Sequence, residues 1–212
     1  MLIHAGIQTT DKSEFDEIFS RVSRKADCVH VDIADGKMVP YVSVSLDKIV
    51  IPSGVNAELH MMVMNPLSLL DSAKTRGFSR VIVHRRSLGS LDDSGLINFI
   101  DYAHEFDLGV VLGLEINEKF PSYEVLERVE GVQFMTIRLG FPGTSFVRES
   151  VDSVVEFHRQ HEDVMIQVDG GINDATVGYI KNIGVGAIVS TSWLSLSDEF
   201  EYRYDYLKKY FD

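Results

Sequence analysis

Residues 28–33 read CVHVDI, a stretch in which three β-branched apolar residues alternate with other types. This period of two is typical of a β-strand, because successive side chains on a strand point to opposite faces of the sheet. The three apolar residues therefore share one face. His30 and Asp32 share the other, so an imidazole and a carboxylate point the same way.

Seven similar short runs recur along the chain, and segments with helical spacing separate them. The eight predicted strands are Leu2–Ile7, Cys28–Ile33, Ala57–Val63, Arg80–His84, Gly109–Leu114, Val132–Ile137, Val164–Val168 and Gly186–Ser190. Strands that alternate with helices indicate a parallel sheet with crossover helices, and eight repeats favour closure into a barrel. We therefore predict the α/β class, a single (β/α)8 TIM barrel.

The segments between the strands place apolar residues three and four positions apart, which predicts amphipathic helices. The expected buried faces are Phe15, Ile18, Phe19 and Val22; Leu96, Phe99, Ile100 and Ala103; and Val151, Val154, Val155 and His158. The segment 43–50 is short, and we expect only a turn or two of helix there. The stretch 198–211 is predicted to be the closing helix.

The chain has 212 residues, 45% of them hydrophobic, which is enough for the core of one barrel domain over residues 1–212. No apolar run reaches the roughly 18 residues that cross a bilayer, and the first residues lack the signal-peptide pattern of a basic segment, an apolar stretch and a small-residue cleavage site. We therefore expect a soluble, cytoplasmic protein with no membrane partner.

The formal net charge of −12 disfavours nucleic-acid binding, which depends on Lys and Arg neutralising phosphates. The same charge would repel anionic small molecules at long range. A phosphate site must then be local, built from backbone N–H groups at loop and helix starts. Cys28 is the only cysteine, so an intrachain disulfide is excluded.

Two other predicted strands carry polar side chains on one face. Alternation puts His60 beside Glu58 and Met62, and puts Asp169 beside Gln167. In a (β/α)8 barrel, reactive groups lie at the C-terminal ends of the strands. Two imidazoles and two carboxylates could therefore converge: His30, Asp32, His60 and Asp169.

Such a set suits Zn²⁺, Mn²⁺ or Fe²⁺ better than Ca²⁺ or Mg²⁺, which prefer oxygen ligands. The alternative is that both histidines are hydrogen-bonded residues lining the barrel, and that both aspartates cap the helices that follow.

Four motifs resemble those of the ribulose-phosphate 3-epimerase family, in the family's order and spacing. They are HVDIADG at 30–36, LHMMV at 59–63, MTIRLGFPG at 135–143 and VDGGIN at 168–173, within a similarity that spans residues 2–210. The resemblance implies an isomerase of carbohydrate metabolism that epimerises carbon 3 of a pentulose or hexulose phosphate. The expected reaction converts D-ribulose 5-phosphate into D-xylulose 5-phosphate, as in the pentose phosphate pathway.

The resemblance also implies roles for individual residues. His30, Asp32, His60 and Asp169 match the ligands of one divalent metal ion, expected to be Zn²⁺, with Fe²⁺, Mn²⁺ or Co²⁺ as alternatives. Asp32 and Asp169 match the catalytic acid/base pair, which moves the proton through a metal-stabilised enediolate. The expected substrate-binding residues are Met62, Met135, Gly140, Gly143, Gly170, Gly171, Ser190 and Thr191.

The chain departs from the family pattern around the substrate. Pro142 lacks an N–H donor, Arg138 adds a charge, and Ser190 stands where the family usually has glycine. Arg85 and Arg86, like Arg138, could contact an anionic substrate, or could be solvated loop charges.

The remaining histidines have other expected positions. His84 ends a predicted strand and could face the pocket or form an ordinary buried hydrogen bond. His4, His104, His158 and His161 are expected at the surface.

Three other functions compete with ribulose-phosphate epimerisation. Allulose-6-phosphate 3-epimerases resemble the chain in the same motifs, including the Thr191-Ser192 end of the last strand. A family member that binds a ligand without turnover is a second alternative. A decarboxylase or aldolase would need a lysine at the barrel mouth, and the predicted strands contain none. By resemblance, we expect a homo-oligomer.

Overall fold

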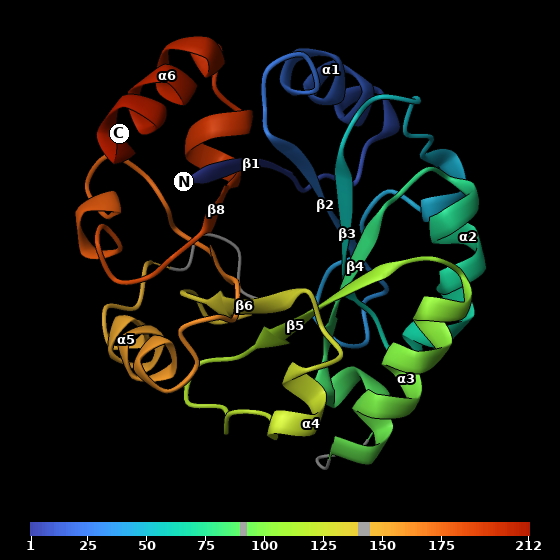
Figure 1. Ribbon diagram of the computed structural model, residues 1–212. Coiled ribbons are helices and arrows are strands. Elements are labelled where there is room, and N and C mark those ends of the chain that lie inside the picture. The colour runs from blue at the N-terminus through green and yellow to red at the C-terminus, as the bar shows by residue number, and fades with distance from the viewer. Residues whose placement is uncertain (90–92, 140–144) are drawn as a thin grey trace.

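The computed structural model describes residues 1–89, 93–139 and 145–212, and its described strands form one closed parallel barrel. Helices surround the strands (Figure 1). The strands are β1 (Leu2–Ile7), β2 (Cys28–Ala34), β3 (Ala57–Met62), β4 (Arg80–His84), β5 (Gly109–Leu114), β6 (Gly131–Met135), β7 (Ile166–Asp169) and β8 (Ala187–Ser190). The first strand pairs with the last, with Ala5 beside Ser190. The predicted (β/α)8 fold is confirmed.

The helices between the strands vary in length. The α-helices are α1 (Lys12–Val22), α2 (Leu70–Thr75), α3 (Asp93–Glu105), α4 (Tyr123–Leu126), α5 (Ser150–Gln160) and α6 (Phe200–Phe211). Short helical turns are η1 (Leu46–Lys48), η2 (Pro66–Leu69), η3 (Arg85–Leu88), η4 (Val177–Tyr179) and the π-helical η5 (Thr191–Ser195). As expected, the segment 43–50 holds only one short turn. No helix of the described ranges is long and apolar enough to span a membrane.

Several details of the sequence prediction were wrong. Strand β7 begins at Ile166, two residues later than expected, and β6 ends at Met135, two residues earlier than expected. In α5, Val155 was expected to be buried but is 45% exposed, whereas Val154 and Phe157 are fully buried. The ring of His161, just beyond the helix, packs on Phe157 at a centroid distance of 4.8 Å. Contacts of this kind depend on tertiary packing, which periodicity does not reveal.

The two faces of the barrel strands differ in chemistry. Outward-facing residues such as Val29, Val31 and Ile33 belong to the main hydrophobic core, between strands and helices. The alternate positions, which face the barrel axis, include many buried polar side chains: His4, His30, Glu58, His60, His84, Gln133, Gln167 and Asp169. The barrel axis is therefore unusually polar for a fold whose interior is dominated by branched apolar residues.

His4 was expected at the surface, and this expectation was wrong. The side chain is fully buried, and its Nδ1 lies 2.7 Å from Glu58 Oε1. Because β1 begins at Leu2, the period-two alternation turns His4 toward the barrel axis.

Candidate functional site

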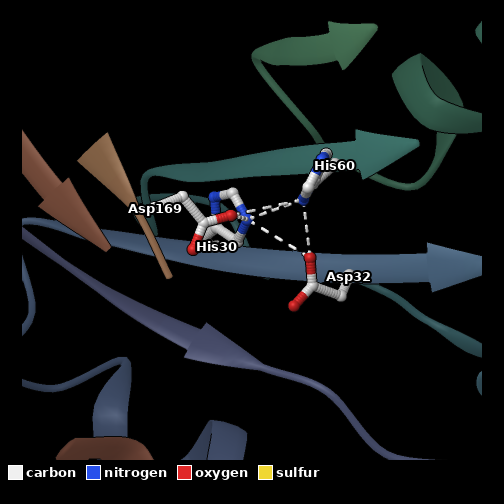
Figure 2. A group of neighbouring side chains, drawn as sticks. All are labelled: His30, Asp32, His60 and Asp169. Atoms are coloured by element: carbon white, nitrogen blue, oxygen red, sulfur yellow. Dashed lines mark hydrogen bonds and ion pairs between the residues drawn. The ribbon is translucent and has the colours of Figure 1, made fainter. Parts of the chain in front are cut away.

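The four residues predicted as metal ligands come together near the mouth of the barrel. His30 and Asp32 lie on β2, His60 lies on β3, and Asp169 ends β7. Asp32 and His60 are direct neighbours across the β2–β3 pair. Figure 2 shows the four side chains pointing toward one another.

One potential ligand atom from each residue faces the same small space. His60 Nδ1 lies 2.8 Å from Asp32 Oδ1 and 3.6 Å from Asp169 Oδ2. His30 Nε2 lies 3.4 Å from Asp32 Oδ1 and 3.8 Å from Asp169 Oδ2. All four atoms lie within 4.8 Å of one another. Two nitrogen and two oxygen donors at this spacing fit a borderline divalent ion such as Zn²⁺.

The outer nitrogen of each imidazole already has a partner, which fixes the tautomer. His30 Nδ1 lies 2.7 Å from Glu58 Oε1, so this nitrogen donates its hydrogen to the carboxylate. His60 Nε2 lies 2.7 Å from Nε2 of His84. Burial and the nearby His60 lower the pKa of His84 well below its usual range, so His84 is neutral.

A neutral His84 can accept a hydrogen bond from His60 Nε2. His30 Nε2 and His60 Nδ1 can then each present a lone pair to a metal ion. These are the nitrogens that lie 3.4 Å and 2.8 Å from Asp32 Oδ1, so a bound ion would replace their hydrogen bonds to Asp32. The donor set and its second layer of partners therefore fit a bound metal ion.

The two aspartates differ in acidity although they share this space. Burial raises the pKa of Asp169 to about 6, and the charge of Asp32 contributes to the increase. Burial also opposes ionisation of Asp32, but hydrogen bonds with His30 and His60 hold its pKa well below the usual range. One carboxyl group therefore binds a proton near neutral pH while its neighbour stays ionised, which is typical of paired acid/base groups.

Binding of a divalent ion is expected to depend on pH. Asp169 must lose its proton to act as a ligand, and its pKa of about 6 means that protons compete below that pH. His30 must also be neutral, and its pKa is raised well above the usual value because, although burial opposes the charge, Asp32 and Glu58 hydrogen-bond to it. The apparent affinity for Zn²⁺ should fall by about tenfold or more from pH 7 to pH 5. Competition titration with a chelator measures this change, and an affinity independent of pH would contradict the ligand set.

A cavity opens above the four residues. Its lining includes Asp32, His60 and Asp169, together with the predicted substrate-binding residues Met62, Met135, Gly170, Gly171 and Thr191. Ser190 adjoins the cavity but is not part of its lining: its side chain is buried, and its hydroxyl donates to the Ile172 carbonyl at 2.8 Å. Gly140 and Gly143 lie outside the described residues.

The loop that carries Gly170 and Gly171 needs both glycines. Their φ angles are +117° and +68°, a left-handed region that favours glycine. A Cβ on Gly170 would lie 2.5 Å from the side chain of Ile137, another residue of the cavity. Because Gly170 has no side chain, the backbone of this loop can pack closely against Ile137 at the edge of the cavity.

Arg85 and Arg86 are engaged with acidic residues instead of pointing freely to a substrate. Arg85 is buried and forms ion pairs with Glu118 at 2.6 Å and Asp93 at 2.9 Å. Arg86 pairs with Glu115 at 2.8 Å. Both charges are therefore neutralised locally.

Two residues of the cavity and its surroundings were not singled out from sequence. Gln8 lines the cavity, as do Tyr41 and Ser192, which the departures from the family pattern and the Thr191-Ser192 pair had pointed to. Gln133 lies inside the barrel and donates to Asp169 Oδ2 at 3.1 Å. Alternation offered a signal for Gln133, because it stands two residues before Met135 and shares its face.

Glu58 lies at the centre of a buried network beneath the site. Its Oε1 accepts hydrogen bonds from His4, His30 and Gln167, and its Oε2 accepts one from Arg80 at 2.7 Å. Burial opposes ionisation of Glu58, but the hydrogen bonds from His30 and His4 hold its pKa well below the usual range. Glu58 also lies near Cys28 and His4 in a second cluster of potential metal ligands, but Arg80 already supplies the positive charge there.

Comparison with known proteins gives consistent results. The model of the ribulose-phosphate 3 epimerase family matches residues 2–194. The cytoplasmic isoform of ribulose-phosphate 3-epimerase from Oryza sativa subsp. japonica is 30% identical over 173 residues, which cover 79% of this chain and 75% of the relative. The ribulose-phosphate 3-epimerase of Chlamydia pneumoniae is 28% identical over 188 residues, covering 82% and 78%.

Solved structures with the same architecture include enzymes of other kinds. A 3-hexulose-6-phosphate synthase superposes with a TM-score of 0.75 at 18% identity, over 100% of both chains. The 3-keto-L-gulonate-6-phosphate decarboxylase of Vibrio cholerae has a TM-score of 0.69 at 10% identity, covering 98% of this chain and 95% of the other. At such identities, the likeness shows the barrel fold alone.

Proposed function

The chain belongs to the ribulose-phosphate 3-epimerase family, isomerases of sugar phosphates, and we propose that it interconverts D-ribulose 5-phosphate and D-xylulose 5-phosphate with a bound divalent ion. The observation that carries this proposal is the pair of carboxylates, Asp32 and Asp169, beside two histidines at the base of one cavity.

Epimerisation at carbon 3 requires removal of a proton from one face of the substrate and delivery of a proton to the other. Asp32 and Asp169 come from strands β2 and β7, so they can approach a bound sugar from different sides. One aspartate takes the proton as base and the other delivers a proton as acid, and the roles reverse in the opposite direction. The pKa of Asp169, raised by burial to about 6, suits a carboxyl group that takes up and releases a proton near neutral pH.

His30, Asp32, His60 and Asp169 would hold the ion, with Zn²⁺ as the first candidate. When bound, the ion supplies Lewis-acid stabilisation of the negative charge on the enediolate. Met62 and Met135 line the same cavity and would keep water away from that charge. Glu58 and His84 hold the two histidines in the tautomers that this role needs.

The phosphate would bind to backbone N–H groups of the loop after β7. No Lys or Arg is among the described residues that line the cavity, so these residues offer no side-chain cation to bind the phosphate. The backbone N–H of Thr136 donates to the carbonyl of Asp169, its hydroxyl donates to the carbonyl of Gly170, and the hydroxyl of Thr176 donates to the carbonyl of Gly171. In a trans peptide the following N–H points away from the carbonyl. The N–H groups of Gly170, Gly171 and Ile172 therefore point away from these anchors, in a loop that borders the cavity.

A second candidate substrate is D-allulose 6-phosphate, a longer sugar with the same reactive carbon. A polar hollow lined by Glu115, Asn117 and Arg138 adjoins the cavity, and both share Ile137 and Leu139. This hollow could receive the additional hydroxymethylene group.

The test is solvent-deuterium incorporation followed by NMR, with Zn²⁺-loaded protein and both sugars in parallel. Label at carbon 3 of the pentulose phosphate supports the first candidate, and faster labelling of the hexulose phosphate selects the second. Absence of label in both sugars, with the ion demonstrably bound, would contradict epimerisation and favour a family member that binds a ligand without turnover.

We also propose that the barrel is a single functional unit. Strand β1 pairs with β8, so the two ends of the described chain belong to one sheet. This closure supports a single domain over residues 1–212. The homo-oligomer stays an expectation that rests on the family.

A further inference from the structure

A chain of buried amides connects Glu58 to Asp169 inside the barrel. Gln167 Nε2 donates to Glu58 Oε1 at 2.8 Å and to Gln133 Oε1 at 2.7 Å. Gln133 Nε2 then donates to Asp169 Oδ2 at 3.1 Å. Gln133 and Gln167 are fully buried neighbours across the β6–β7 pair, so the chain of hydrogen bonds runs through the interior of the barrel from β3 to β7.

Glu58 dictates the direction in which these hydrogen bonds run. An ionised carboxylate can only accept, so the Gln167 amide must turn its nitrogen toward Glu58. The same nitrogen donates to the carbonyl oxygen of Gln133, which turns the nitrogen of Gln133 toward Asp169. Arg80, His4 and His30 keep Glu58 ionised by donating to its two oxygens.

The hydrogen bond from Gln133 reaches one particular oxygen of Asp169. Oδ2 is also the oxygen that faces His30 and His60, at 3.8 Å and 3.6 Å. A hydrogen bond donated to this oxygen hinders rotation of the carboxylate about the Cβ–Cγ bond of Asp169. Oδ2 is then held toward the ligand space, and Oδ1 is left for the substrate.

We propose that Gln133 is a positioning residue that orients Asp169 for proton transfer. This inference rests on the proposed epimerisation and adds a residue that acts only on one of the two aspartates. Asp32 is held instead by His30 and His60. Loss of the Gln133 hydrogen bond should therefore slow the Asp169 step and leave the Asp32 step unchanged.

The test compares Gln133→Met with the natural protein, because Met has a similar volume but cannot donate. Both proteins are loaded with Zn²⁺ and assayed from each epimer, with protium or deuterium at carbon 3. We expect kcat to fall about 10-fold to 100-fold. The deuterium isotope effect should rise for the epimer whose proton Asp169 removes, because that cleavage becomes rate-limiting. It should fall for the other epimer, because its cleavage by Asp32 precedes the slow step.

A second readout does not depend on turnover. Chelator competition should show about 10-fold weaker Zn²⁺ binding by Gln133→Met, since Oδ2 is both the held oxygen and the proposed ligand atom. Gln160→Met, at an exposed glutamine of α5, is the matched control and should change neither readout. If Gln133→Met does not fold, Gln133→Asn is used for the same measurements. Its side chain is one methylene shorter, so its amide cannot reach Asp169 Oδ2.

The outcomes separate the inference from the proposed function. Turnover by the natural protein, with isotope effects and Zn²⁺ affinity unchanged in the folded variant, would overturn the role of Gln133. A uniform loss of kcat without opposite changes in the two isotope effects would also overturn it, since a merely structural defect slows both steps alike. No turnover of either epimer by the natural protein would refute the proposed function instead.

Discussion

Asp169→Asn is expected to reduce exchange of the carbon-3 proton, in the epimer that Asp169 deprotonates, by roughly 10²-fold to 10⁴-fold, the usual contribution of one acid/base group. The amide has nearly the same shape as the carboxylate but cannot take up or deliver the proton. The fold should be retained, because burial already disfavours the charged form of Asp169. Solvent-deuterium incorporation measures exchange, and thermal unfolding checks the fold.

The pH dependence of stability gives an independent check on Asp169. The pKa of Asp169 in the folded protein, about 6, is higher than in the unfolded chain. The protonated carboxyl group therefore stabilises the fold, and this contribution to the free energy of unfolding is complete below the pKa that Asp169 has when unfolded. This contribution is lost as pH rises through about 6. In the metal-free state, the free energy of unfolding of Asp169→Asn should therefore not show this decrease as pH rises through about 6.

The control for this prediction is Asp71→Asn, an exposed aspartate on α2, which should leave exchange unchanged. Asp32→Asn should produce a comparable loss of exchange in the other epimer, because Asp32 acts on the opposite face of carbon 3. Exchange at the natural rate from both epimers in both site variants would contradict the proton-transfer assignment.

Glu58→Gln is expected to lower the free energy of unfolding by about 3–5 kcal/mol, the usual cost of removing one partner from a buried ion pair. The amide loses the charge that Arg80, His4 and His30 share. It also places N–H donors against four groups that now donate to Glu58. Urea denaturation of the metal-free protein measures the change.

The matched control is Glu124→Gln on α4, where the glutamate side chain is 64% exposed and its Oε1 lies 3.6 Å from Nη2 of Arg128. Exposed pairs contribute little, so this variant should lose less than about 1 kcal/mol. A loss of similar size in both variants would contradict the central role of Glu58 in the network.

Local patterns predicted much of the site. The period of two in residues 28–33 put His30 and Asp32 on one face, and the same rule grouped His60 with Glu58. In the structure, the potential ligand atoms of His30, Asp32, His60 and Asp169 all lie within 4.8 Å of one another. The role of these residues as ligands stays a prediction until an ion is measured.

Residues whose importance depends on distant partners were harder to find. The sequence placed His4 at the surface, because the partner that accounts for its burial, Glu58, lies 54 positions away along the chain. Gln133 was not singled out, because its contact with Asp169 spans 36 positions. Nothing near either residue in the sequence names its partner.

The sequence by itself determined the alternation of strands and helices and the face of each strand that carries the polar groups. These are local properties, because backbone geometry sets the repeat of side-chain directions within a few residues. Only the tertiary structure decided that the polar faces turn inward, that His84 supports His60, and that two glutamines link Glu58 to Asp169. These contacts depend on the closure of the barrel and the register between strands, which bring residues from different repeats within hydrogen-bond distance.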